Sequence, residues 1–86
     1  MHVVRNVTYV DDHKLILLFE DGSERLVDLA QELDGEIFEP LRDVNYFKNV
    51  RVNSDINTIA WGNGADMSPD FLYKIGTPVE RRSVAA

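Results

Sequence analysis

The stretch WGNGADMSPDFLY, residues 61–73, decides the fold of this 86-residue chain. A strand that ends at Trp61 is followed by a glycine-rich turn, and Ser68 and Pro69 are favoured as the N-cap and the first residue of a helix. We expect Trp61 to be buried and to hold the preceding hairpin against this last helix. The residues predicted to build the turn and the helix cap are Trp61, Gly62, Asn63, Gly64, Asp66, Ser68 and Pro69.

An antiparallel meander is predicted in the N-terminal third of the chain. Residues 3–10 are rich in β-branched side chains and residues 15–19 are continuously apolar, as is typical of strands. The pair Asp21-Gly22 suits the positive φ angles of a two-residue type I′ turn. This turn leads into a third strand over residues 24–29.

The two-residue turn also predicts the register of the second and third strands. It places Leu17 opposite Leu26 and Ile16 opposite Val27, so apolar side chains lie on both faces of the sheet. Two apolar faces are typical of a central strand that is covered on both sides. We therefore expect one face to pack against helices and the other to meet the chain itself or a partner.

Short helices are predicted after the meander. Asp28 and Gln31 have the spacing of a capping box, which favours a helix over residues 29–33. Pro40 favours a second helical segment over residues 37–44. The core candidates in this region are Phe38, Leu41 and Phe47.

A second hairpin is predicted just before the final helix. Its strands cover residues 50–53 and 58–61, with a turn between them. The final helix has an apolar face and ends near Gly76. The residues of that apolar face are Phe71, Leu72 and Ile75.

Together these elements predict an α+β fold. We expect a small two-layer domain with an antiparallel sheet of about five strands and short helices, including a C-terminal one. Residues 1–76 form this single domain, and residues 77–86 form a flexible C-terminal tail. A domain of this size has marginal stability, which makes a homodimer a reasonable expectation.

The formal net charge of −6 is concentrated in one part of the sequence. Residues 11–43 contain eleven acidic and three basic residues, a balance of −8. Such a surface repels phosphate backbones, which argues against nucleic-acid binding, and it favours a protein partner with a basic surface. The alternative interpretation is that this acidic surface is solvated and only keeps the protein soluble. The candidate partner-binding residues are Asp11, Asp12, Glu20, Asp21 and Glu24 around the first two turns, and Glu32, Asp34, Glu36 and Glu39 in a second acidic group.

Several kinds of site are excluded or disfavoured by composition. The chain has no cysteine, which excludes disulfides, thiolate metal sites and thiol nucleophiles and is compatible with the cytoplasm. No apolar run has the roughly 20 residues that cross a bilayer.

His2 lies near a loose terminus and His13 in an exposed acidic turn, and neither has a catalytic partner that follows from the sequence. We expect no enzymatic activity.

The glycine-rich turn does not match a known ligand-binding loop. Gly62 and Gly64 lack the spacing and the following lysine of a phosphate-binding loop. Asn63, Asp66 and Asp70 offer oxygen ligands but not the alternating pattern of a calcium loop. We therefore expect no cofactor and no metal here.

The order of these motifs is similar to that of a known family. The pattern W-x-N-G-A-D-x-S-P-x-x-L-Y at residues 61–73 follows a DG hairpin, V-D-L, F-x-x-L-R-D and F-x-x-V. In these motifs the chain resembles the bacterial domain of unknown function 2442 family over residues 1–76. The family tryptophan is typically followed by proline, whereas this chain has Gly62, which implies a looser turn.

This resemblance implies a small α+β domain with an antiparallel sheet and no established activity or catalytic residues. Some relatives carry an added helix-turn-helix domain, and small members are considered antitoxin-like neighbours of toxin-like proteins. We interpret the chain as a non-catalytic protein-interaction or regulatory module, with an antitoxin-like role. The alternatives are a structural homo-oligomeric module and a small-molecule or metal-binding protein.

Overall fold

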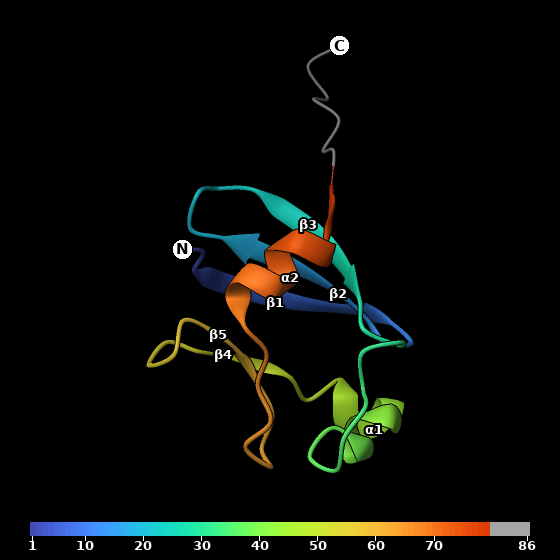
Figure 1. Cartoon of the computed structure of the whole chain (residues 1–86). Coiled ribbons are helices and arrows are strands. Elements are labelled where there is room, and N and C mark those ends of the chain that lie inside the picture. Colours follow the sequence, from blue (N-terminus) through green and yellow to red (C-terminus); the bar gives the residue numbers. More distant parts are fainter. Residues whose placement is uncertain (80–86) are drawn as a thin grey trace.

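The computed structural model describes residues 1–79 and shows two antiparallel sheets with short helices (Figure 1). The strands β1, β2, β3 and β6 form one sheet in that order, and β4 and β5 form the other. This confirms the α+β class and replaces the single predicted sheet by two. The elements are β1 (Val4–Asp11), β2 (Lys14–Phe19), β3 (Glu24–Asp28), the 3-10 helix η1 (Glu39–Arg42), α1 (Val44–Phe47), β4 (Arg51–Asn53), β5 (Thr58–Ala60), α2 (Pro69–Ile75) and β6 (Thr77–Pro78).

The register between β2 and β3 differs from the prediction by one residue. Leu26 lies opposite Ile16 rather than Leu17. The reason is a three-residue loop, Glu20–Gly22, which is closed by a backbone hydrogen bond of 2.9 Å between the residues on either side. Within this loop only Gly22 has a positive φ, 87°, whereas a type I′ turn needs two such residues.

The two faces of β2 have different surroundings. The odd-numbered residues from Leu15 to Phe19 are buried in the core. Here α2 lies over the sheet, with the Tyr73 ring edge-on and 4.9 Å from the Phe19 ring. Ile16 and Leu18 lie on the opposite face and are only half-buried. We call the face beneath α2 the inner face and the opposite one the outer face.

The segment between β3 and β4 is less helical than predicted. Residues 29–33 form a single turn instead of a helix, and the Asp28 carboxylate accepts a hydrogen bond from the Ala30 N–H (3.0 Å). So short a segment makes too few backbone hydrogen bonds to offset the cost of helix nucleation. The second predicted segment, residues 37–44, is present as η1, with Pro40 in its first turn, and α1 follows it as a helix that was not predicted. Of the core candidates, Leu41 and Phe47 are fully buried and Phe38 is half-buried.

Trp61 is buried as predicted, with 2% of its surface exposed, but its anchor is α1. The indole Nε1 donates to the Phe47 carbonyl (2.9 Å), and the two rings are 5.7 Å apart. The expectation that Trp61 holds the hairpin against the last helix is therefore wrong: the hydrogen bond and the ring contact of the Trp61 side chain are with Phe47 of α1. The turn after Trp61 directs α2 away toward the large sheet, while α1 stays beside the hairpin (Figure 1).

The start of α2 follows the sequence cues. Ser68 is the N-cap, its hydroxyl accepts from the Phe71 N–H (3.4 Å), and Pro69 is the first residue. Leu72 is fully buried, whereas Phe71 is 37% exposed and so does not belong to the buried face. Successive helical residues point about 100° apart, and in α2 it is Leu72 rather than Phe71 that points toward the core.

The end of α2 lies directly against β3. A Cβ atom on Gly76 would sit 2.8 Å from the Cβ of Arg25, so the chain passes here only because residue 76 has no side chain. Beyond it, residues 77–78 pair with β3 and extend the sheet. The predicted tail, residues 77–86, thus begins with a strand, and residues 80–86 lie outside the described residues.

Candidate functional site

The first predicted acidic group is divided between the two ends of β2. Asp11 and Asp12 lie at the β1–β2 turn, whereas Glu20, Asp21 and Glu24 lie at or beside the β2–β3 loop. A strand of six residues spans about 20 Å. The five acids therefore form two separate sets, at what we call the turn end and the loop end of the sheet.

At the loop end, the carboxylates are engaged within the protein. Glu20 forms an ion pair with Arg5 (3.0 Å). Asp21 accepts from the N–H and hydroxyl of Ser23 (2.9 and 2.6 Å) and from the Tyr73 hydroxyl (3.3 Å). The bonds from Ser23, more than that from Tyr73, lower the pKa of Asp21.

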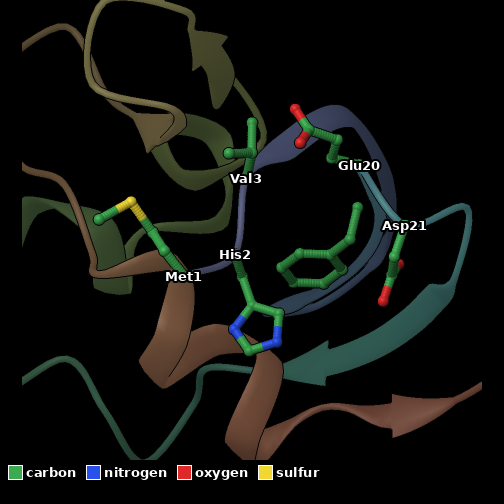
Figure 2. A pocket seen from close by; sticks show the side chains of 6 residues that line it. Met1, His2, Val3, Glu20 and Asp21 are labelled. Atoms are coloured by element: carbon green, nitrogen blue, oxygen red, sulfur yellow. The ribbon is translucent and has the colours of Figure 1, made fainter.

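A small pocket opens at this end beside the N-terminus. Figure 2 shows Met1 and His2 on one side of it and Glu20 and Asp21 on the other. The cavity measures about 180 Å³, below the roughly 300–1,000 Å³ of sites for drug-sized ligands. The pocket therefore gives little support to a small-molecule function.

The N-terminal segment is held in place at this pocket, contrary to the expectation of a loose terminus. The main-chain N–H and the Nδ1 of His2 both contact Oδ1 of Asp70 (2.8 and 2.9 Å). The imidazole stacks on Tyr73 at 3.7 Å, and the Arg25 guanidinium lies over the same ring at 3.8 Å. The bond from the His2 main chain, followed by that from its ring, lowers the pKa of Asp70.

At the turn end, His13 joins the β1–β2 turn to η1. Its Nε2 lies 3.0 Å from the carbonyl oxygens of both Leu41 and Arg42. A carbonyl only accepts hydrogen bonds, so Nε2 carries the proton. The ring also packs edge-on against Phe47 at 4.8 Å. His13, expected to be an exposed turn residue, is a half-buried clamp.

This clamp fixes acids from two segments at the turn end. Asp11 pairs with Lys14 (3.9 Å) and Asp34 with Arg42 (3.6 Å). The other predicted acids here have side chains without an ion pair or hydrogen bond to residues 1–79, and we call them the unpaired acidic surface: Asp12, Glu32, Glu36 and Glu39.

The acidic residues of the turn end affect the pKa of Tyr9. Its hydroxyl donates to the Asp12 carbonyl (3.1 Å). Partial burial, followed by the charges of Asp12 and Asp11, raises the pKa of Tyr9. The charges at this end thus act on a neighbouring group of the protein itself.

The glycine-rich turn, residues 61–65, is held by hydrogen bonds to the protein itself. The Trp61 N–H donates to the Ala65 carbonyl (2.9 Å), and Gly64 has a φ of 91°. Asn63 accepts from the Ala65 N–H (3.0 Å) and donates to the Ile37 carbonyl (2.8 Å). Both side-chain groups of Asn63 are therefore occupied. The remaining turn and cap residues are Gly62 in the turn, Asp66, which bridges to Ala60, and Ser68 and Pro69 at the start of α2.

The described residues contain neither a metal cluster nor a membrane-crossing helix. Within residues 1–79, no three His, Cys, Asp or Glu side chains are arranged to hold a metal ion. None of the helices in this part of the chain has the length and apolar content that crossing a membrane requires.

Sequence reasoning missed the cluster around Tyr73. His2, Arg25, Asp70 and Tyr73 come from three parts of the chain, the N-terminal segment, β3 and α2, which meet only when α2 covers the inner face. The one local signal was the carboxylate of Asp70 in the first turn of a helix, which is typical of helix-dipole stabilisation rather than of a tertiary contact.

Comparisons with known proteins identify a family. No curated protein and no solved structure matched the chain. A family model described as a protein of unknown function (DUF2442) matches residues 4–78. This range includes every strand and helix described above, and it agrees with the resemblance seen in the sequence motifs. The chain therefore belongs to the DUF2442 family.

Proposed function

We propose that this chain is a non-catalytic protein-interaction module whose unpaired acidic surface binds a basic surface of a partner protein. The observation that carries this proposal is that Asp12, Glu32, Glu36 and Glu39 lack partners within the described residues, in segments that the His13 clamp holds together. A Lys or Arg of a partner meets these carboxylates without displacing an internal ion pair. Charge-assisted hydrogen bonds of this kind are stronger than neutral ones.

Long-range electrostatics support the same proposal. The net charge of −6 attracts basic proteins and accelerates their association. At physiological ionic strength this attraction extends over a Debye length of about 8 Å, and it weakens as salt is added. Binding through the unpaired acidic surface is therefore expected to be salt-sensitive.

The environment of the two histidines supports a non-catalytic role. The His2 imidazole contacts Asp70 and the rings of Tyr73 and Phe19, and His13 is bonded to main-chain carbonyls. Both side chains are used to hold the structure together. In this proposal the module is regulatory, with an antitoxin-like role in the bacterial cytoplasm, a compartment compatible with its cysteine-free sequence.

The test is affinity capture from the native lysate at low and high salt, read by mass spectrometry. Three baits are compared: the wild type, the double variant Glu36→Lys/Glu39→Lys, and the control Asp55→Lys. Asp55 is an exposed acid in the β4–β5 turn, away from the unpaired acidic surface. We expect one basic protein that the wild type and the control capture at low salt only, and that the double variant does not capture.

The captured protein then allows the rates to be measured. Charge reversal at Glu36 and Glu39 is expected to slow association more than it accelerates dissociation. Equal capture by all three baits, or capture that is insensitive to salt, would show that the unpaired acidic surface is not the binding site.

A further inference from the structure

The outer face of the large sheet is apolar at its centre and lies opposite the side that α2 covers. Residue alternation places Ile16 and Leu18 of β2 and Leu26 of β3 side by side on this face, and all three are half-buried. On β1, Asn6 and Thr8 lie opposite Leu18 and Ile16 and are exposed. A sheet with apolar residues on both faces is typical of one that is covered on both faces.

The size of this face indicates what covers it. Three strands spaced about 4.8 Å apart and about five residues long give a footprint of roughly 14 by 17 Å, or about 240 Å². A stable interface between two globular proteins buries about 800 Å² per partner. The outer face alone is therefore too small for a second globular copy. It matches one helix, which is about 10 Å wide and covers 17 Å in about three turns.

The charges around the face indicate the chemistry of that helix. Glu24 and Asp28 share the outer face with Leu26, at the two ends of β3. Among residues 1–79, Lys14 is the lysine on this face; it lies opposite Asp28 and forms an ion pair with Asp11 (3.9 Å), so three acids face one base. A second copy would also oppose one net charge of −6 with another. The rim is thus negative and favours a positively charged occupant.

We infer that the outer face binds an amphipathic helical segment of a partner protein, with an apolar stripe on Ile16, Leu18 and Leu26 and Lys or Arg residues flanking it. This inference rests on the proposed function and deepens it by naming a second contact surface and the form of the bound segment. The half-buried aliphatic side chains supply the area, and the acidic rim sets the orientation.

The test is an NMR titration of the full ¹⁵N-labelled chain with synthetic peptides. The probe is a three-turn helix with leucines at i, i+3, i+4 and i+7 and lysines on its flanks. A scrambled peptide has the same composition without the apolar stripe, and a third peptide carries Glu in place of Lys. The protein variants are Ile16→Thr/Leu26→Thr, which places a β-branched residue that favours strands at both positions, and the control Ile56→Thr. Ile56 is 42% exposed in the β4–β5 turn.

We expect saturable shifts on the outer-face residues of β1–β3 with the amphipathic basic peptide only. The double variant should weaken this binding about tenfold or more, while the control leaves it unchanged. Equal binding of the scrambled peptide, or no binding of the probe, would overturn the inference. So would a dimer in light scattering that the double variant dissociates.

The same titration separates this inference from the proposed function. Shifts confined to residues 29–42 and the β1–β2 turn would support the unpaired acidic surface and refute the outer face. Shifts on the outer face that persist unchanged in the Glu36→Lys/Glu39→Lys variant would support the outer face independently of the acidic surface, which the capture experiment tests by itself. Circular dichroism of each variant confirms that the fold is retained.

Discussion

Replacing Trp61 by alanine is expected to remove most of the stability of this domain. The ring is 2% exposed, and truncating a buried aromatic side chain costs about 3–5 kcal/mol. The change also removes the hydrogen bond from the indole to the Phe47 carbonyl, and an unsatisfied buried acceptor costs about 1–3 kcal/mol. At 0.05–0.15 kcal/mol per residue, a chain of 86 residues has a total stability of only about 4–13 kcal/mol.

Trp61→Phe separates these two contributions. Phenylalanine keeps most of the buried aromatic surface but has no N–H to offer the Phe47 carbonyl. Its cost should therefore be near that of the lost hydrogen bond with a small cavity, about 1–3 kcal/mol. Ile56→Ala is the matched control, because this side chain is 42% exposed and its truncation should change stability by less than about 0.5 kcal/mol.

Urea unfolding followed by far-UV circular dichroism measures all three variants. The chain has a single tryptophan, so a fluorescence assay would lose its signal with the mutation. With a urea dependence near 1 kcal/mol per molar, Trp61→Phe should lower the midpoint by about 1–3 M, and Trp61→Ala should lower it by at least about 3 M. A Trp61→Ala midpoint close to that of the wild type would refute the anchoring of the second hairpin by this ring.

Two further predictions concern backbone packing and acid stability. Gly76→Ala should destabilise by about 1–3 kcal/mol because its Cβ would lie 2.8 Å from that of Arg25, whereas Gly62→Ala should be nearly neutral because its nearest neighbour is 3.7 Å away; urea midpoints test both. The pKa values of Asp21 and Asp70 lie below their ordinary 3.8 in the folded state. The two ionised carboxylates therefore stabilise the folded state above about pH 4, and this contribution to the free energy of unfolding is lost as the pH falls through the lowered pKa values. Between about pH 6 and 2, the melting temperature of Asp70→Asn should fall by less than that of the wild type. An equal fall of the two melting temperatures would contradict this prediction.

The sequence predicted those parts of the fold that depend on neighbouring residues. The Ser68 cap and the strand that leads to Trp61 were found because each signal lies within a few positions of the element it defines. The Asp21-Gly22 pair marked the first loop correctly but not its length. Asp-Gly fits both a two-residue type I′ turn and a three-residue loop that ends in a left-handed glycine, and the structure has the second.

The candidate sites were less predictable, because charge in a sequence carries no information about pairing. Asp21 and Asp12 are equally acidic in the sequence, yet Asp21 accepts three hydrogen bonds while the carboxylate of Asp12 has none within residues 1–79. His13 joins the β1–β2 turn to η1, and its role depends on carbonyls 28 and 29 positions away. Such contacts follow from the fold and not from spacing.

The two proposed surfaces would act on different steps of binding. The unpaired acidic surface carries exposed charges, which accelerate encounter and are screened by salt, so changes at Glu36 and Glu39 act on the association rate. The outer face is apolar at Ile16 and Leu26, so its contacts form after encounter and act on dissociation. The two sets share no contact among those described, which makes their effects on binding free energy additive. A partner that associates more slowly with the Glu36→Lys/Glu39→Lys variant, and that dissociates faster from the Ile16→Thr/Leu26→Thr variant at every salt concentration, would show that both surfaces belong to one interface.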